Sequence, residues 1–153
     1  DVKKRDIKKV LNDENYRVSN QIDLEIIKKF YEDTMKKNNG SYSQDALNKI
    51  FEFMESQKKE NKIIQSTIYF FEKPIYSVLF LNDEVSSCYL YGSGDTEIKN
   101  RYAGSLALWK AIEQSIGMQL SYIDLEGINS PYRGEYKLNF GGCIESYFNL
   151  NFK

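Results

Sequence analysis

The sequence predicts a mixed α/β (α+β) fold in which a mainly antiparallel sheet is flanked by helices. Two apolar stripes at helical spacing lie within residues 20–60, which predicts a pair of amphipathic helices. Three segments rich in β-branched and aromatic residues follow, separated by short polar turns, which predicts an antiparallel meander. A further helix then leads to another strand, and a helical crossover of this kind implies a parallel strand pair.

The chain opens with a basic segment. Residues 2–13 predict a short helix, and residues 15–19 can form a short strand. The helix carries five cations: Lys3, Lys4, Arg5, Lys8 and Lys9. A solvated helix face is the commoner reason for such a cluster, and contact with phosphates is the alternative.

Two helices are predicted next. Asn20 and Asp23 suit the start of the first, and residues 38–40 close it. Its apolar stripe is Ile27, Phe30, Tyr31, Thr34 and Met35. Ser41 and Gln44 have the form of a capping box for the second helix. Its stripe is Leu47, Ile50, Phe51 and Met54, and both stripes are expected in the core.

The meander is predicted from strands at 63–71, 75–81 and 85–91, with turns at 72–74 and 82–84. After it, a helix over 102–116 is apolar on most sides and is therefore expected to lie deep between layers.

The C-terminal third alternates again. A strand is predicted at 119–125, a short helix at 131–139 that Asn129 or Ser130 caps, and a last strand at 143–152. The chain shows no repeat or low-complexity linker, so a single α/β domain is expected.

The amino-acid composition limits the ligands and catalytic mechanisms that are available to the protein. The 153 residues include 21 basic and 22 acidic side chains, so no general polyanion-binding surface is indicated. The chain has no histidine, which excludes Ser–His and Cys–His catalysis and most zinc chemistry, and no metal cofactor is expected. The two cysteines lack metal-ligand spacing and suit a reducing cytoplasm. No apolar run is long enough for a membrane helix, so no membrane span is expected.

The order of elements and several local motifs resemble the GNAT acyltransferase superfamily, and more specifically its FemABX branch and related FemAB-like acetyltransferases of polysaccharide clusters. The resemblance lies in a strand ending in tyrosine and glycine, a tryptophan-containing helix, a strand closing on aspartate and glycine, and an aromatic–lysine pair followed by phenylalanine and glycine. These are the segments 89–93, 107–112, 122–127, 136–137 and 140–142.

Such proteins usually carry two GNAT-like halves. Residues 1–19 look like the connector helix and strand that enter the second half, and 20–153 look like a single GNAT-like domain. Because the chain starts on Asp1, it is expected to be a fragment of a longer, two-domain bacterial protein whose N-terminal half is missing.

The resemblance implies a donor site at the start of the predicted 102–116 helix, where backbone N–H groups and the helix dipole favour a pyrophosphate. Arg101, Gly104 and Ser105 occupy the positions of the superfamily's phosphate loop, although Leu106 stands where a small residue is usual. Close helix packing is the alternative reason for Gly104.

The resemblance also implies that Lys137, after Tyr136, helps hold the donor and stabilises charge in acyl transfer. Arg133 lies one helical turn earlier and is expected on the same donor-binding face. Asp124 or Glu126 is a candidate general base, and the alternative, which we favour, is that Asp124 is the ion-pair partner of Lys137 or Arg133.

The implied function is an N-acyltransferase that forms an amide on an amine-bearing sugar or a cell-wall or surface-polysaccharide precursor, with acyl-CoA (acetyl-CoA) as the anionic donor. One alternative is a FemABX-type transferase that uses aminoacyl-tRNA to build a peptidoglycan bridge, which the near-neutral charge disfavours. The other is a non-catalytic scaffold or binding half.

Overall fold

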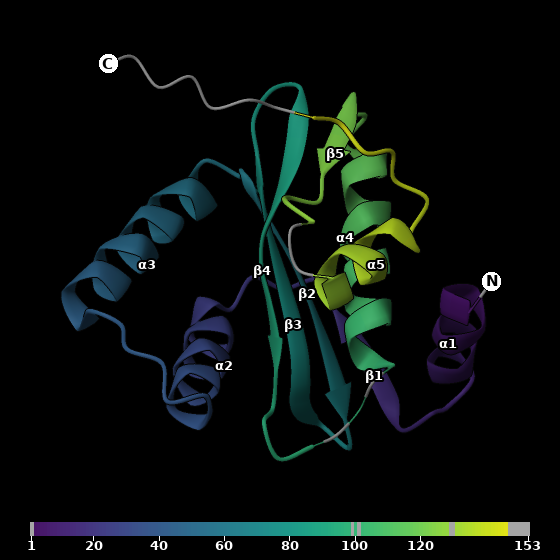
Figure 1. Cartoon of the computed structure of the whole chain (residues 1–153), viewed down its shortest axis with the longest axis horizontal. Helices are drawn as coiled ribbons and strands as arrows, with labels where there is room; N and C mark the ends of the chain where they lie inside the picture. Colours follow the sequence, from purple (N-terminus) through teal and green to yellow (C-terminus); the bar gives the residue numbers. More distant parts are fainter. Residues whose placement is uncertain (1, 99, 101, 129–130, 147–153) are drawn as a thin grey trace.

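The computed structural model describes residues 2–98, 100, 102–128 and 131–146. They form five helices and five strands (Figure 1). In chain order these are α1 (Val2–Leu11), β1 (Tyr16–Ser19), α2 (Leu24–Lys37), α3 (Gln44–Lys59), β2 (Ile63–Phe70), β3 (Lys73–Asn82), β4 (Ser86–Gly94), α4 (Ala103–Gly117), β5 (Tyr122–Asp124) and α5 (Pro131–Leu138).

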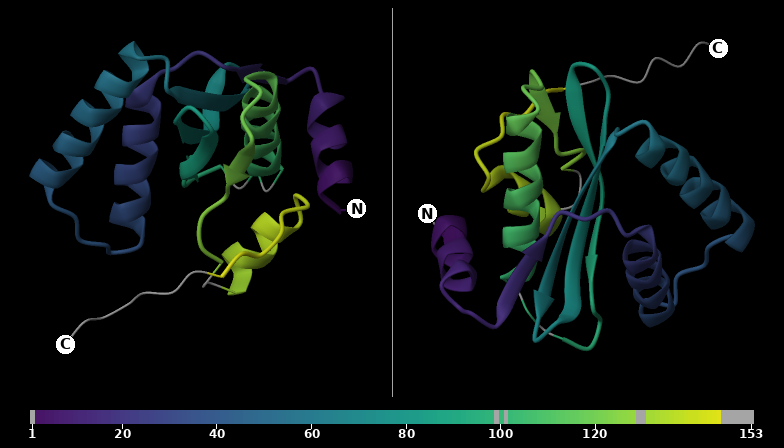
Figure 2. Two further views of the ribbon diagram at one scale, coloured as in Figure 1. Left: turned by 90° about the horizontal axis from the view of Figure 1, so that it is seen from above. Right: turned by 180° about the vertical axis from the view of Figure 1, so that it is seen from behind.

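The described residues form one five-stranded sheet in the order β1-β2-β3-β4-β5, covered on both faces (Figures 1 and 2). Helices α2 and α3 cover one face, while α1, α4 and α5 lie on the other. All neighbouring strands are antiparallel except β4 and β5, which are parallel. The predicted mixed fold, meander and crossover are therefore confirmed.

The turn between β2 and β3 lies one residue earlier than predicted. Phe70 pairs with Lys73, so Phe71 and Glu72 form a two-residue hairpin loop. Both have positive φ, at 46° and 61°. A loop of this kind matches the twist of the strands, and it lets β3 begin at Lys73 instead of Ile75.

Of the N-caps predicted for the two helices on the first face, the one for α2 is confirmed and the one for α3 is wrong. Asp23 accepts a hydrogen bond from Glu25 N and is the N-cap of α2. For α3 the predicted Ser41–Gln44 capping box is wrong: Ser43 is the N-cap and accepts from Ala46 N. Because α3 begins at Gln44, a box with Gln44 at the third position has no helix turn to close.

Most of the predicted stripe residues are buried beneath the sheet. The core on this face contains Leu24, Ile27, Leu47, Phe51, Met54, Ile63 and Leu79. Tyr31, Thr34 and Met35 are only partly buried, and half of the surface of Ile50 is exposed.

On the other face, α4 is the central helix, as its apolar character predicts. Its residues pack with β2, β3 and β4 around Phe80, which is fully buried. Helix α1 joins this core through Ile7 and Val10, and β1 extends the sheet beyond β2. Residues of α1 and β1 therefore pack with the rest of the described chain, and their role as a connector stays a prediction.

The end of the chain differs from expectation. Strand β5 is only three residues long, because the chain turns at Gln119, which has a φ of +59°. Of the predicted last strand, residues 143–146 form no strand and are exposed, and 147–152 lie outside the described residues. Within the described part of the chain, no helix has both the length and the apolar character that a bilayer crossing requires.

Candidate active site

The candidate site extends from the point where β4 and β5 separate to the start of α4. Strand β5 pairs only with the first three residues of β4, from Ser86 to Cys88. Beyond Cys88, β4 continues to Gly94, and Leu90 forms a bulge in its pairing with β3. Bulges bend and twist a strand, so β4 turns away from the line of β5 before it leads into α4.

The side chain of Asn100 is hydrogen-bonded to the backbone at the start of α4. Its Oδ1 atom accepts hydrogen bonds from the backbone N–H groups of Tyr102 and Ala103, both at 3.1 Å. Its Nδ2 atom donates to the hydroxyl of Tyr16 on β1, which fixes the orientation of the amide. The first turn of α4 has no acidic residue, so the positive end of its helix dipole is not neutralised from within the turn.

The ring of Tyr76 packs closely against two glycines near this point, Gly94 and Gly104. A Cβ atom on Gly94 would lie 2.6 Å from both the Ile75 carbonyl oxygen and the Tyr76 ring. A Cβ atom on Gly104 would lie 3.0 Å from the same ring. The close-packing role that we considered for Gly104 is confirmed, and its donor-binding role stays a prediction.

Three helices meet at Ser105 in the first turn of α4. The Ser105 hydroxyl accepts a hydrogen bond from Lys3 Nζ of α1 at 3.3 Å and hydrogen-bonds to Tyr136 of α5. Lys3 also lies over the Tyr136 ring, 4.2 Å from its centroid. Burial raises the pKa of Tyr136 above its usual range, so the phenol stays neutral. The structure thus brings together two predicted donor-binding residues, Ser105 and Tyr136.

Helix α1 places positive charge beside this turn. Lys9 Nζ lies 5.2 Å from the centroid of the Tyr102 ring, and Lys3 lies at Ser105. Burial lowers the pKa of Lys3, an effect that Asp6 partly opposes. Two ammonium groups beside the positive end of a helix repel both that end and each other, and an anion bound between them relieves this repulsion.

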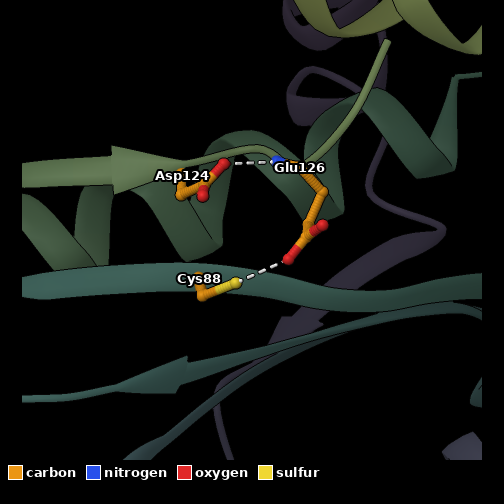
Figure 3. A group of neighbouring side chains, drawn as sticks. All are labelled: Cys88, Asp124 and Glu126. Atoms are coloured by element: carbon orange, nitrogen blue, oxygen red, sulfur yellow. Dashed lines mark hydrogen bonds between the residues drawn. The ribbon is translucent and has the colours of Figure 1, made fainter. Parts of the chain in front are cut away.

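Asp124, Glu126 and Cys88 gather where β4 and β5 part (Figure 3). Asp124 accepts a hydrogen bond from Glu126 N at 2.7 Å, and the Cys88 thiol donates to Glu126 Oε1 at 3.0 Å. Burial, followed by the Glu126 carboxylate, raises the pKa of Cys88 to about 12, so its thiol is protonated at neutral pH. One ligand atom from each residue lies within 4.8 Å of the others, a spacing that a metal ion can bridge.

Lys137 lies across from this group. Its Nζ atom donates to the Gly127 carbonyl oxygen at 3.1 Å and lies 5.3 Å from the centroid of the Tyr89 ring on β4. The ion pair that we favoured between Asp124 and Lys137 is not among those that join described residues. The physical reason is local: the Asp124 carboxylate turns to the backbone of its own loop, and Lys137 reaches the next residue of that loop.

Arg101, Asn129, Ser130 and the side chain of Arg133 lie outside the described residues.

The sequence analysis did not single out two residues that the structure places at the candidate site. Asn100 had a usable signal, an amide side chain just before a helix start. Cys88 had none, because its contact with Glu126 depends on strand register.

Comparisons with known proteins agree on the fold. No protein-family model matches the chain, and no curated protein is detectably similar to it in sequence. Among solved structures, the chain is similar to a GCN5-related N-acetyltransferase from Ralstonia eutropha, with a TM-score of 0.70 and 9% identity over 90% of this chain and 98% of that one. It is also similar to a predicted acetyltransferase with acetyl-CoA from Clostridium acetobutylicum, with a TM-score of 0.64 and 11% identity over 90% and 95% of the two chains.

A third similar structure is glucosamine-6-phosphate N-acetyltransferase from Arabidopsis thaliana, with a TM-score of 0.58 and 12% identity over 91% of this chain and 99% of that one. The fold is therefore that of the GCN5-related N-acetyltransferases, the GNAT fold. At these identities the similarity concerns the fold alone.

Proposed function

We propose that this chain is a cytoplasmic N-acyltransferase that uses acyl-CoA, with acetyl-CoA as the simplest donor, to form an amide on a primary amine. The observation that carries the proposal is the first turn of α4. It contacts Tyr136 of α5, has no acidic residue, and is flanked by ammonium groups of α1. Two phosphates of a donor suit this positive turn. The acetyl-CoA in the similar Clostridium acetobutylicum structure supports this donor class.

In the proposed reaction the amine nitrogen attacks the thioester carbonyl carbon, the carbon–sulfur bond breaks, and the CoA thiolate takes up a proton. Arg101, Arg133, Gly104, Ser105 and Tyr136 are the proposed donor-binding residues. Lys137 would stabilise the developing oxyanion. Asp124 is the proposed catalytic carboxylate, and the amine proton passes to it or to water.

The proposed acceptor is an amino sugar or another amine of a cell-wall or surface-polysaccharide precursor. The glucosamine-6-phosphate N-acetyltransferase among the similar structures supports an amino-sugar acceptor. Two other functions compete with this one, an aminoacyl-tRNA-dependent transferase and a non-catalytic scaffold, and both would involve a further GNAT-like half.

A donor panel tests the proposal. Thermal unfolding of the chain is measured with CoA, acetyl-CoA and an aminoacyl-tRNA mimic, followed by acetyl transfer to a panel of amino sugars. We expect CoA and acetyl-CoA to raise the unfolding midpoint, because a ligand that binds only the folded state stabilises it. A response to the tRNA mimic alone would favour the FemABX alternative, and no response to any donor would favour the scaffold.

The cations of α1 give a second test. Lys9→Gln is expected to weaken CoA binding roughly threefold at low salt, because one exposed cation near a phosphate contributes a few tenths to 1 kcal/mol. Lys8→Gln is the matched control, since it removes the same charge from the neighbouring residue of the same helix. Calorimetric titration at low and high salt compares them, and equal affinities of the two variants would exclude a role of Lys9.

Lys137 is tested through turnover. With an amine found in the panel, Lys137→Ala is expected to lower kcat roughly tenfold with little change in the KM for acetyl-CoA. The reason is that a partly solvated ammonium stabilises an oxyanion less than a buried donor does. Lys137→Arg keeps the charge and should lose less. Unchanged kcat in Lys137→Ala would remove this residue from the mechanism.

A further inference from the structure

The segment between β4 and α4 is fastened at its first residue. Asp95 N donates to the Ile75 carbonyl oxygen at 2.9 Å, which extends the pairing of β3 and β4 by one residue. The Asp95 carboxylate pairs with Lys73 Nζ of β3 at 2.7 Å. Its Oδ1 atom also accepts from the backbone N–H groups of Glu97 and Ile98, at 2.8 and 3.3 Å. The Asp95 side chain thus joins two N–H groups of the segment to Lys73 of β3.

Asp95 is well shielded for a charged residue. Its side chain is 13% exposed, whereas that of Lys73 is 55% exposed. The hydrogen bond from Lys73 is the largest cause that holds the pKa of Asp95 below its usual range, so the carboxylate is ionised at neutral pH. The shielded Asp95 carboxylate, which also accepts two backbone hydrogen bonds, is held more firmly than a carboxylate in a fully exposed ion pair.

A second lysine reaches the same segment from α2. Lys37 Nζ donates to the Thr96 carbonyl oxygen at 2.6 Å. Lys73, Asp95, Thr96 and Lys37 line a groove of about 640 Å³ between α2 and this segment. Since α2 and α4 cover opposite faces of the sheet, the segment that leads into α4 is anchored from the face opposite the candidate donor site (Figure 2).

We infer that Asp95, held by Lys73, is a positioning residue for the acyl donor. The inference rests on the proposed donor site at α4. The bonds of Asp95 hold the N–H groups of Glu97 and Ile98. The Ile98 carbonyl oxygen in turn accepts a hydrogen bond from Asn100 N, and Asn100 Oδ1 holds the N–H groups at the start of α4. Without them, residues of this segment must be ordered when the donor binds, and that ordering reduces affinity.

The test is calorimetric titration of the intact chain with CoA. Asp95→Ala and Lys73→Gln are expected to raise the Kd roughly five- to tenfold, because ordering the freed segment on binding costs affinity. Asp95→Asn is expected to lie between them and wild type, because it keeps an acceptor for the N–H groups. Lys73→Arg should restore most of the affinity. Lys36→Gln is the matched control, since Lys36 lines the same groove from the same helix as Lys37.

Two measurements distinguish a positioning role of Asp95 from partial unfolding of the variants. Binding stoichiometry near one shows that a variant is folded, so a raised Kd then reports a weaker site and not a smaller folded fraction. In addition, Asp95→Ala combined with Lys73→Gln should lose little more than Asp95→Ala alone, because the two residues act through one contact.

The outcomes distinguish the inference from the function on which it rests. If wild type binds CoA and Asp95→Ala, Asp95→Asn and Lys73→Gln all bind within twofold of it, the inference is overturned and the donor site stands. If wild type does not bind CoA at millimolar concentration, the proposed function fails, and the inference fails with it. Should Asp95→Ala not fold, the other two variants decide.

Discussion

Asn100→Asp is expected to weaken CoA binding roughly 10- to 100-fold without lowering the free energy of unfolding. The substitution is nearly isosteric and puts a full negative charge at the start of α4, where the donor phosphates are proposed to bind. Coulomb repulsion between partly solvated charges a few ångströms apart amounts to about 1–3 kcal/mol, and each 1.4 kcal/mol changes affinity about tenfold.

The folded structure should accept this change. Asn100 uses only Oδ1 to accept from Tyr102 N and Ala103 N, and an aspartate keeps that acceptor. The hydroxyl of Tyr16 can donate to the second carboxylate oxygen in place of accepting from Nδ2. Aspartate and asparagine both accept hydrogen bonds from the N–H groups at the start of a helix, and a negative charge there interacts favourably with the helix dipole.

Calorimetric titration and thermal unfolding measure both effects. Asn48→Asp on the exposed face of α3 serves as the control, because it adds the same charge on the opposite face of the sheet. Loss of affinity in both variants to the same degree would indicate a long-range charge effect. Unchanged affinity in Asn100→Asp would contradict the proposed position of the phosphates.

Phe80→Ala is expected to lower the free energy of unfolding by about 3–5 kcal/mol, a range found for large-to-small changes in packed cores. Phe80 is fully buried in β3 beneath α4, and its ring meets that of Tyr89 edge-on with centroids 5.7 Å apart. Its removal would leave a cavity between the sheet and the helix that carries the candidate site.

Urea unfolding measures the loss, and the matched control is Phe53→Ala. Phe53 has half of its surface exposed on α3, so its truncation should cost well under half as much. Equal losses in the two variants would mean that the packing of α4 on β3 is not the main core.

The sequence was sufficient for elements whose signal is local. The apolar periodicity around Phe30 and Met54 identified α2 and α3, and the composition of α4 predicted its central position. The crossover rule then gave the parallel pairing of β4 with β5. Local signals gave the wrong N-cap for α3. Ser41 and Ser43 both precede this helix, and Ser43 is the N-cap because the helix begins at Gln44.

The site was less predictable because its geometry depends on long-range contacts. Ser105 and Tyr136 were chosen from a resemblance, and the structure does bring them together. Lys3 at the same point could not be foreseen, because it lies 102 residues from Ser105 in the chain. The contact between Cys88 and Glu126 likewise requires the register of a three-residue strand.

The most direct test of the proposed donor site is an NMR titration of the ¹⁵N-labelled chain with acetyl-CoA. We expect saturable shifts that are largest at the backbone amides of Tyr102, Ala103, Gly104 and Ser105, and we expect Asn100→Asp to reduce them greatly. Saturable shifts centred on α2 and α3, or no saturable shift at all, would contradict a donor site at the start of α4.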